Sequence, residues 1–265
     1  MVWLLAGSSF KMHDVSRNAP IVPSAYQSSN FTKVRKIRKV VSALFILLFV
    51  VACGGGDLTK VAFVSGENRD QNEIYVVDVT GGNESRLTVN DWEDTSPCWS
   101  PDNTQIAFKS QRDDREELYI MAADGSDLRR VTYFNKRIRP GVNDLYLGPN
   151  CWSHDGKKLT FSFKNIIYSV NANITNLKPY DREGKYPGFS NNGKYISFSS
   201  EAGDSYSVHI MDVEGNNPKE VFYSEYELPN CWSWSPNSKK LACTKGSELF
   251  VVEVSSGEVT LLQSS

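Results

Sequence analysis

The stretch Ser96–Thr132 reads SPCWSPDNTQIAFKS, then a short polar loop, then ELYIMAADGSDLRRVT, and this pattern returns along the chain. Five copies align on an aliphatic residue of the second expected strand: Val61, Ile106, Leu159, Ile196 and Leu241. The anchors are 45, 53, 37 and 45 residues apart, which is typical of propeller blades rather than helical repeats. Because such a repeat cannot bury its apolar face alone, neighbouring copies must pack against one another.

Each copy is expected to form short strands. The segments IAF and ISF alternate with a period of two, and IYVVD from Ile74 is β-branched and aromatic. Asx and Gly residues between these segments favour tight hairpins. Seven residues before four of the anchors stands an aromatic residue: Trp99, Trp152, Phe189 and Trp234. We expect the three tryptophans to be buried between blades. The sequence therefore predicts an all-β protein, a single β-propeller of five or six blades, over residues 59–265.

These motifs resemble the TolB-type β-propeller repeat, whose pattern reads WSPDGxxIAFxS followed by IYxMDADGxxxxxLT. The resemblance covers the chain after the region near Cys53 and implies the propeller fold. The separate α/β domain of TolB has no counterpart in this sequence, so TolB's role in the Tol–Pal complex is not expected to carry over. The first copy has Gly54 at the Trp position. We therefore expect irregular closure, with one three-stranded blade.

A second pattern precedes the repeats. Five basic residues (Lys33, Arg35, Lys36, Arg38 and Lys39) are followed by the apolar segment 40–52 and by Cys53. An apolar segment of this length is typical of a secretory signal. Its end, VVAC, resembles the bacterial lipobox, which implies cleavage before Cys53 and lipidation of that residue. Residues 33–52 are thus predicted to be a lipoprotein signal peptide and residues 53–58 a glycine-rich tether. A buried cysteine at a helix end is the alternative.

Residues 1–32 are polar, lack periodicity and are expected to be an unstructured upstream extension. A misassigned translation start would explain them, and a genuine cytoplasmic extension is the alternative. The protein is then expected outside the cytoplasm. Gly54 rather than Asp follows Cys53, and by resemblance to the sorting pattern of Gram-negative lipoproteins this implies a lipid anchor in the outer membrane, on its periplasmic side or at the surface.

Charge narrows the class of partner. The chain has 29 basic and 31 acidic residues, and the part after residue 52 keeps 22 basic and 30 acidic ones, a net charge of −8. No basic stripe for a phosphate backbone is present, so nucleic acid is not expected as a partner. Contact with the membrane is expected through the lipid anchor only, and the protein is expected to be a monomer.

No pattern for catalysis, a metal or a cofactor was found. A G-x-S-x-G motif is absent from the sequence. His154 and His209 fall at different repeat positions, so we expect no site shared between them. Cys98, Cys151, Cys231 and Cys243 show no metal-ligand spacing. We expect them to be buried free thiols, with a Cys98–Cys151 disulfide as the alternative.

Propeller topology places the Trp-Ser-Pro-Asp and Ala-Asp-Gly turns on one face, which we call the turn face. The connections between blades, and those between second and third strands, lie on the other face, which we call the ligand face. The longer, variable connections on the ligand face are where binding is expected. The candidate binding residues are Trp92, Glu93, Asp94, Arg139, Asp144, Tyr146, Asp181, Arg182, Tyr186, Glu225 and Tyr226.

The sequence therefore predicts a non-catalytic binding or scaffold module for an envelope protein or a glycan. The alternative is an enzyme, or an accessory subunit, that acts on polysaccharide outside the cell or in its envelope. On the first interpretation Trp92, Tyr146 and Tyr186 are exposed and lie around one channel mouth.

Overall fold

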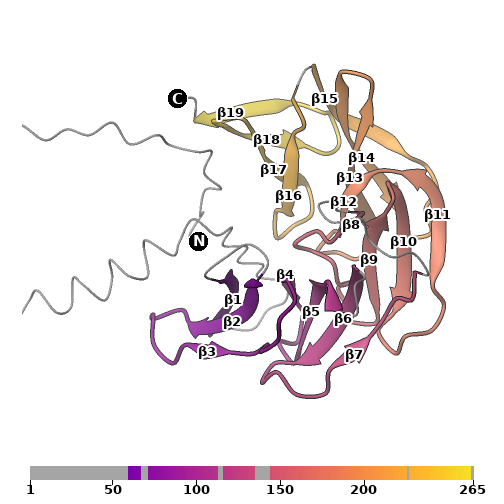
Figure 1. Cartoon of the computed structure of the whole chain (residues 1–265). Coiled ribbons are helices and arrows are strands. Elements are labelled where there is room, and N and C mark those ends of the chain that lie inside the picture. The colour runs from indigo at the N-terminus through magenta and orange to yellow at the C-terminus, as the bar shows by residue number, and fades with distance from the viewer. Residues whose placement is uncertain (1–58, 67–70, 113–115, 135–143, 226, 264–265) are drawn as a thin grey trace, which may run out of the picture.

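The computed structural model describes residues 59–66, 71–112, 116–134, 144–225 and 227–263. For residue 232 it describes the backbone only. The predicted extension, signal peptide and tether lie outside the described residues. Five separate antiparallel sheets follow one another around a common centre (Figure 1). The prediction of an all-β propeller is confirmed, with five blades.

The first two blades contain seven strands. They are β1 (Lys60–Ser65), β2 (Glu73–Asp78) and β3 (Ser85–Arg86) in blade 1, and β4 (Asp94–Trp99), β5 (Gln105–Ser110), β6 (Glu117–Ala122) and β7 (Arg129–Arg130) in blade 2. Blade 1 has three strands, as expected, and the strand that is missing among the described residues is the innermost one.

The other three blades have four strands each. They are β8 (Leu145–Tyr146), β9 (Lys158–Phe163), β10 (Ile166–Asn171) and β11 (Lys178–Glu183) in blade 3; β12 (Lys185–Phe189), β13 (Tyr195–Ala202), β14 (Ser205–Asp212) and β15 (Lys219–Glu225) in blade 4; and β16 (Asn230–Trp234), β17 (Lys240–Lys245), β18 (Glu248–Glu253) and β19 (Val259–Gln263) in blade 5. In each of these blades the first strand is the innermost and the last lies at the periphery (Figure 1).

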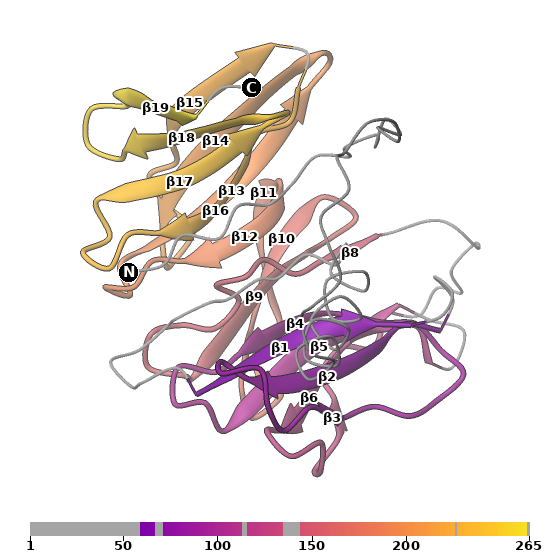
Figure 2. The ribbon, with the colours of Figure 1, turned by 90° about the vertical axis from the view of Figure 1, so that its left-hand side faces the viewer.

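Hydrophobic cores lie between successive blades. One buried cluster joins blade 1 to blade 2, another blade 2 to blade 3, a third blade 3 to blade 4, and a fourth blade 4 to blade 5. Among the described residues no such cluster joins blade 5 to blade 1. Figures 1 and 2 agree in placing these two sheets at the two ends of the arc. The stacking that the repeat requires is therefore fulfilled at four interfaces.

The tryptophans of the repeat are buried, as predicted: Trp99, Trp152 and Trp234 are at most 7% exposed. Phe189, at the same repeat position, is buried as well. The indole N–H of Trp152 donates to the carbonyl of Cys98, 3.1 Å away in the preceding blade, and Trp234 makes the corresponding bond to Gly188 at 3.4 Å. Trp99 Nε1 has no partner among the described residues. In blades 3 and 5 the acceptor lies on the innermost strand of the preceding blade, and blade 1 has no such strand among the described residues.

A Ser-x-Asx turn closes the first hairpin of blades 2 to 5. In blade 2, Ser100 Oγ donates to Asp102 Oδ1 at 2.6 Å and accepts from the backbone N–H of Gln105 at 2.9 Å. The hydrogen bond from Ser100 lowers the pKa of Asp102, and Ser153 does the same to Asp155. Asn192 and Asn237 take the Asx position in blades 4 and 5. The recurring Trp-Ser-x-Asx sequence thus encodes one turn geometry.

The cysteines are paired, so the expectation of free thiols is wrong. Cys98 is bonded to Cys151 with a Cα–Cα distance of 6.3 Å, and Cys231 to Cys243 at 4.0 Å. The first bond joins the inner strand of blade 2 to the chain segment that follows β8 in blade 3. The second joins facing residues on β16 and β17. The equal repeat position of Cys98 and Cys151 was the available signal, because stacked blades bring equivalent positions close together.

Candidate ligand face

The beginnings of the innermost strands define the ligand face. Trp92 lies two residues before β4, Tyr146 ends the short strand β8, and Tyr186 is the second residue of β12. Because β4, β8 and β12 are equivalent strands of successive blades, these three residues lie at the same end of the propeller. Trp92 is 38% exposed, whereas both tyrosines are half-buried.

Tyr146 and Tyr186 pack together. Their rings meet edge to face with centroids 5.0 Å apart, and the ammonium of Lys185 lies 5.7 Å from the ring centre of Tyr146. Lys185 also forms an ion pair with Glu201 at 3.0 Å. Burial, followed by the neighbouring Tyr146, raises the pKa of Tyr186. These four residues, the tyrosine cluster, combine aromatic surface with charge, a mixture suited to recognition of a polar partner.

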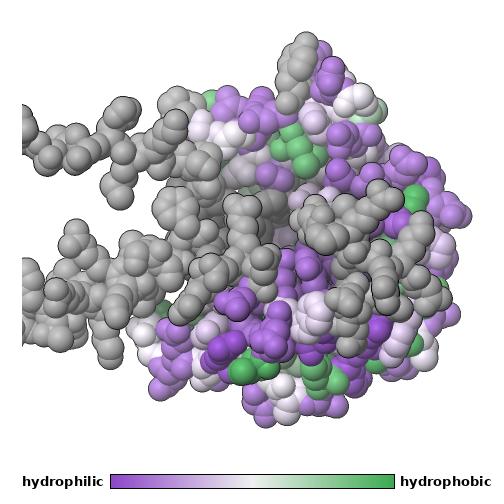
Figure 3. Space-filling model, viewed as in Figure 1, coloured by the Kyte–Doolittle hydropathy of each residue, from purple (hydrophilic) through white to green (hydrophobic). Residues whose placement is uncertain are grey.

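A small cavity adjoins the tyrosine cluster. Its volume is about 20 Å³, enough for about one water molecule. It is lined by Asn165, Glu183, Gly184, Lys185, Ser199, Ser200, Glu201 and Leu228. A site of this size cannot enclose a small-molecule substrate, so contact with a partner here would occur on an open surface. The side of the molecule that Figure 3 shows is largely hydrophilic, with only small separate hydrophobic patches.

The acidic residues beside Trp92 are engaged within the protein. Glu93 accepts hydrogen bonds from Asn72 at 3.3 Å and from Gln111 at 2.8 Å. Asp94 is fully buried and forms an ion pair with Arg112 at 2.9 Å. Its Oδ2 also accepts from Asn90, whose side-chain oxygen accepts from the backbone N–H of Trp92. This network positions Trp92, whose side chain stays partly exposed.

The other candidates are spread over the molecule. Asp181 and Arg182 lie on the peripheral strand β11, so the expectation that they occupy an inter-blade loop is wrong. The connection from β11 to β12 is a single residue, Gly184. Asp144 is half-buried, and its backbone N–H donates to Glu116 Oε2 at 2.8 Å. Glu225 is exposed at the end of β15. Arg139 and Tyr226 lie outside the described residues.

Sequence reasoning missed two members of the tyrosine cluster, Lys185 and Glu201. Lys185 faces Ser199 in the pairing of β12 with β13, which carries its ammonium towards the end of the β13–β14 hairpin. The register shifts between Lys185 and Gly188, and such an irregularity has no clear sequence signal.

The histidines do not form a joint site. His154 is exposed in the turn before β9, whereas His209 lies in β14 and stacks on Phe198 at 5.3 Å. In the part of the chain that the structure describes, no group of three His, Cys, Asp or Glu side chains is placed to hold a metal ion. Likewise no helix in that part is both long and apolar enough to cross a membrane.

The fold and this face define a class of proteins, the β-propellers with TolB-type repeats. Residues 55–205 match the family model described as the TolB beta propeller domain (PD40). The chain therefore belongs to this family, as the repeat motifs had indicated.

Curated relatives match parts of the chain. The Tol-Pal system protein TolB of Methylococcus capsulatus is 34% identical over 93 residues, which are 34% of this chain and 20% of that protein. An uncharacterized protein of Agrobacterium fabrum is 37% identical over 177 residues, 66% of this chain and 47% of that one. The chain thus spans less than half the length of these relatives.

Solved structures share the fold. TolB from Acinetobacter baumannii is 23% identical, with a TM-score of 0.57 over 77% of this chain and 53% of that chain. A putative TolB from Agrobacterium tumefaciens is 15% identical, with a TM-score of 0.60 over 77% and 76%. An oligogalacturonate lyase in complex with manganese gives 13% identity and a TM-score of 0.53 over 76% and 64%. At these identities the likeness shows a shared fold only, and this fold occurs in both binding proteins and enzymes.

Proposed function

We propose that this protein is a lipid-anchored, extracytoplasmic binding or scaffold module that recognises an envelope protein or a glycan through its ligand face. The observation that carries the proposal is the tyrosine cluster, an aromatic pair with an attached ion pair at the inner ends of blades 3 and 4. Trp92 adds an exposed aromatic residue at the same end of the propeller. The relative named as a Tol-Pal system protein supports an envelope setting.

Two further observations support the location outside the cytoplasm. Two disulfides are typical of an oxidising compartment. The basic segment, apolar segment and VVAC sequence ending at Cys53 supply a route of export and an anchor. Two or more acyl chains are enough for stable attachment to a membrane.

The anchor is tested by metabolic labelling with a fatty-acid analogue. We expect the wild-type protein to be labelled and to appear in the membrane fraction, and Cys53→Ser to lose the label. Equal labelling of both proteins would rule out Cys53 as the acylated residue. The binding face is tested separately, so the two parts of the proposal can fail independently.

The binding face is tested by capture from solubilised envelopes. The variant Trp92→Ala/Tyr146→Ala/Tyr186→Ala is expected to lose at least nine-tenths of the captured material while its β-sheet circular dichroism is kept. The matched control is Val79→Ala/Leu128→Ala, which removes two exposed apolar side chains from the turns after β2 and β6 on the turn face. Undiminished capture by the triple variant would contradict the proposal, and turnover of a glycan by the wild type would favour the enzyme alternative.

A further inference from the structure

One position in the repeat departs from the rest. The pairing of the second and third strands fixes one equivalent position on the third strand of every blade, and in blades 1 to 4 the residue at this position is buried. The residues at this position are Val76, Ile120, Ser169, Ile210 and Val251. Val76, Ile120 and Ile210 belong to the clusters that join their blades to the next. Blade 3 alone has a polar residue here, at its interface with blade 4.

A cavity occupies the place that the aliphatic side chain fills elsewhere. Its volume is about 180 Å³. Its lining comes from β9, β10 and β11 of blade 3 and from the turn after β14 of blade 4: Lys158, Ser169, Asn171, Asn176, Lys178, Tyr180, Val213 and Glu214. Ser169 and Tyr180 are buried, while Lys158, Asn176 and Lys178 are exposed. The first two therefore form the floor and the others the mouth.

Tyr180 holds the two blades together across this cavity. Its hydroxyl donates to the carbonyl of Val213 at 2.9 Å. Gly215 has a φ of +92°, and a Cβ at this position would collide with the Tyr180 ring. The equivalent Gly125 of blade 2 has a φ of +86°. Burial raises the pKa of Tyr180, the hydrogen bond with Ser169 opposes this, and the charges of Glu214 and Asp212 add to the increase. The phenol therefore remains protonated at neutral pH and keeps its hydrogen bond.

Because the Tyr180 hydroxyl bonds to the carbonyl of Val213, Lys178 does not bind that carbonyl, unlike the equivalent lysine of the next blade. At the next interface Lys219 donates to the carbonyls of Val254 and Ser255, at 3.2 and 2.7 Å. Lys178 has the same position in its blade as Lys219, since Ser169 faces Lys178 and Ile210 faces Lys219. In blade 3 Tyr180 takes the equivalent carbonyl. Lys178 instead lies over the Tyr180 ring, 5.7 Å from its centre.

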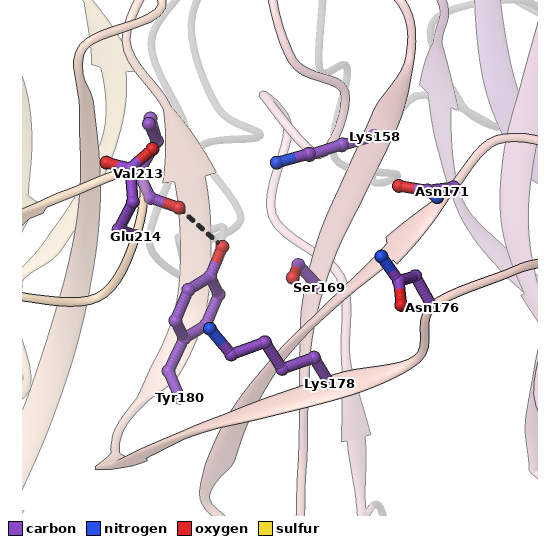
Figure 4. Close-up of a pocket in the computed structure, with 8 residues that line it drawn as sticks. All are labelled: Lys158, Ser169, Asn171, Asn176, Lys178, Tyr180, Val213 and Glu214. Atoms are coloured by element: carbon purple, nitrogen blue, oxygen red, sulfur yellow. Dashed lines mark hydrogen bonds between the residues drawn. The ribbon is translucent and has the colours of Figure 1, made fainter.

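The polar ends of the lining side chains converge. Figure 4 shows the ammonium of Lys158 and the ends of Ser169, Asn176 and Tyr180 directed at one space. Neither Lys158 nor Lys178 has a carboxylate within ion-pair distance among the described residues. Cations and neutral donors thus outnumber the single carboxylate, Glu214. The space is complementary to an anion that also carries hydroxyl groups.

We propose that this cavity, on the turn face between blades 3 and 4, binds a small hydroxylated carboxylate. The carboxylate lies between Lys158 and Lys178, and the hydroxyl groups contact Ser169 and Asn176. A volume of about 180 Å³ holds roughly six water molecules, which corresponds to a molecule of about six to thirteen heavy atoms. The site lies on the face opposite the tyrosine cluster, so it does not depend on the function proposed above.

The test is isothermal titration of the protein with D-gluconate, and with glucose as a neutral molecule of similar size. Gluconate is expected to bind with a heat that saturates below 10 mM, and glucose at least tenfold more weakly. Inorganic phosphate separates binding of any anion from binding of a hydroxylated carboxylate. Phosphate binding as tight as that of gluconate, or no gluconate binding up to 10 mM, would overturn the proposal.

Two variants locate the site. Ser169→Ile restores the residue type of the other blades, fills the cavity, and is expected to abolish gluconate binding while keeping or raising the Tm. Lys178→Met changes an exposed residue and is expected to weaken binding at least tenfold without affecting folding. Lys239→Gln, an exposed lysine remote from the cavity in sequence, is the matched control and keeps wild-type affinity. Wild-type affinity in Ser169→Ile would show that gluconate binds elsewhere.

Discussion

At the scale of the residue, His209 is the polar exception at a third-strand position that is otherwise aromatic. The equivalent residues in the other blades are Tyr75, Tyr119, Tyr168 and Phe250. The imidazole stacks on Phe198 as Tyr119 stacks on Phe108, so it serves as a packing side chain. Burial lowers the pKa of His209, and Glu220 opposes that effect without reversing it.

This lowered pKa predicts a pH dependence of stability. Because the folded protein binds the proton less readily than the unfolded chain, the free energy of unfolding falls as the pH drops through the unfolded value of about 6.5. The variant His209→Tyr is expected to remove this loss between pH 7.5 and 5.5. Urea unfolding at several pH values measures it, and parallel curves for variant and wild type would contradict the expectation.

At the scale of the element, the outer strands of blades 1 and 2 are held by polar contacts. Glu73 pairs with Arg86 at 2.7 Å in blade 1, and Glu117 with Arg130 at 2.6 Å in blade 2. In blade 2, Thr132 Oγ1 also accepts from the backbone N–H of Leu118 at 3.0 Å. These contacts attach the outer strand, only two residues long in both blades, to the strand beside it.

The two disulfides are expected to stabilise the fold to different extents. Cys98–Cys151 closes a loop of 53 residues and Cys231–Cys243 one of 12. In the chain-entropy description the longer loop stabilises the fold by about 4 kcal/mol and the shorter by about 3 kcal/mol. We therefore expect Cys98→Ala/Cys151→Ala to lower the free energy of unfolding more than Cys231→Ala/Cys243→Ala does. Chemical denaturation of both double variants provides the comparison, and the reverse order would argue against it.

The sequence predicted the blades because turn and strand signals are local: the Ser-x-Asx turns and the buried Trp152 follow directly from the motif. The site was predicted less well, because it depends on pairing between segments. Asp94 reads as a loop carboxylate, yet Arg112 and Asn90 engage it inside the fold. The cavity above Ser169 depends on strand register, which places Ser169 at the position that aliphatic residues occupy in the other blades.

At the scale of the whole molecule, the described residues form an arc of five blades with four cores between them. Two observations within this part of the chain mark the open end at blade 1, namely the absence of an inner strand and of a hydrogen-bond partner for Trp99 Nε1. At the other end, Val259, Leu261 and Leu262 of β19 are each about half exposed, between 46% and 54%. Both ends therefore present surface that the interior blades bury.

The open end predicts uneven protection of backbone amides. Strand β1 pairs with β2 on one side only among the described residues, whereas its counterpart β5 lies between β4 and β6. Hydrogen–deuterium exchange is expected to be faster over Lys60–Ser65 than over Gln105–Ser110. Equal protection of the two strands would mean that another segment pairs with the inner edge of β1.

Because each hydrophobic core lies between two consecutive blades, the order of the blades along the chain also determines the order in which the cores can form. Every core is completed as soon as the following blade has emerged, and none among the described residues waits for the two ends of the sequence to meet. Contacts of short sequence separation require little loop closure before they stabilise the structure. A chain that crosses a membrane from its amino terminus could therefore fold in order of its appearance, one blade at a time, while the rest is still unfolded on the other side.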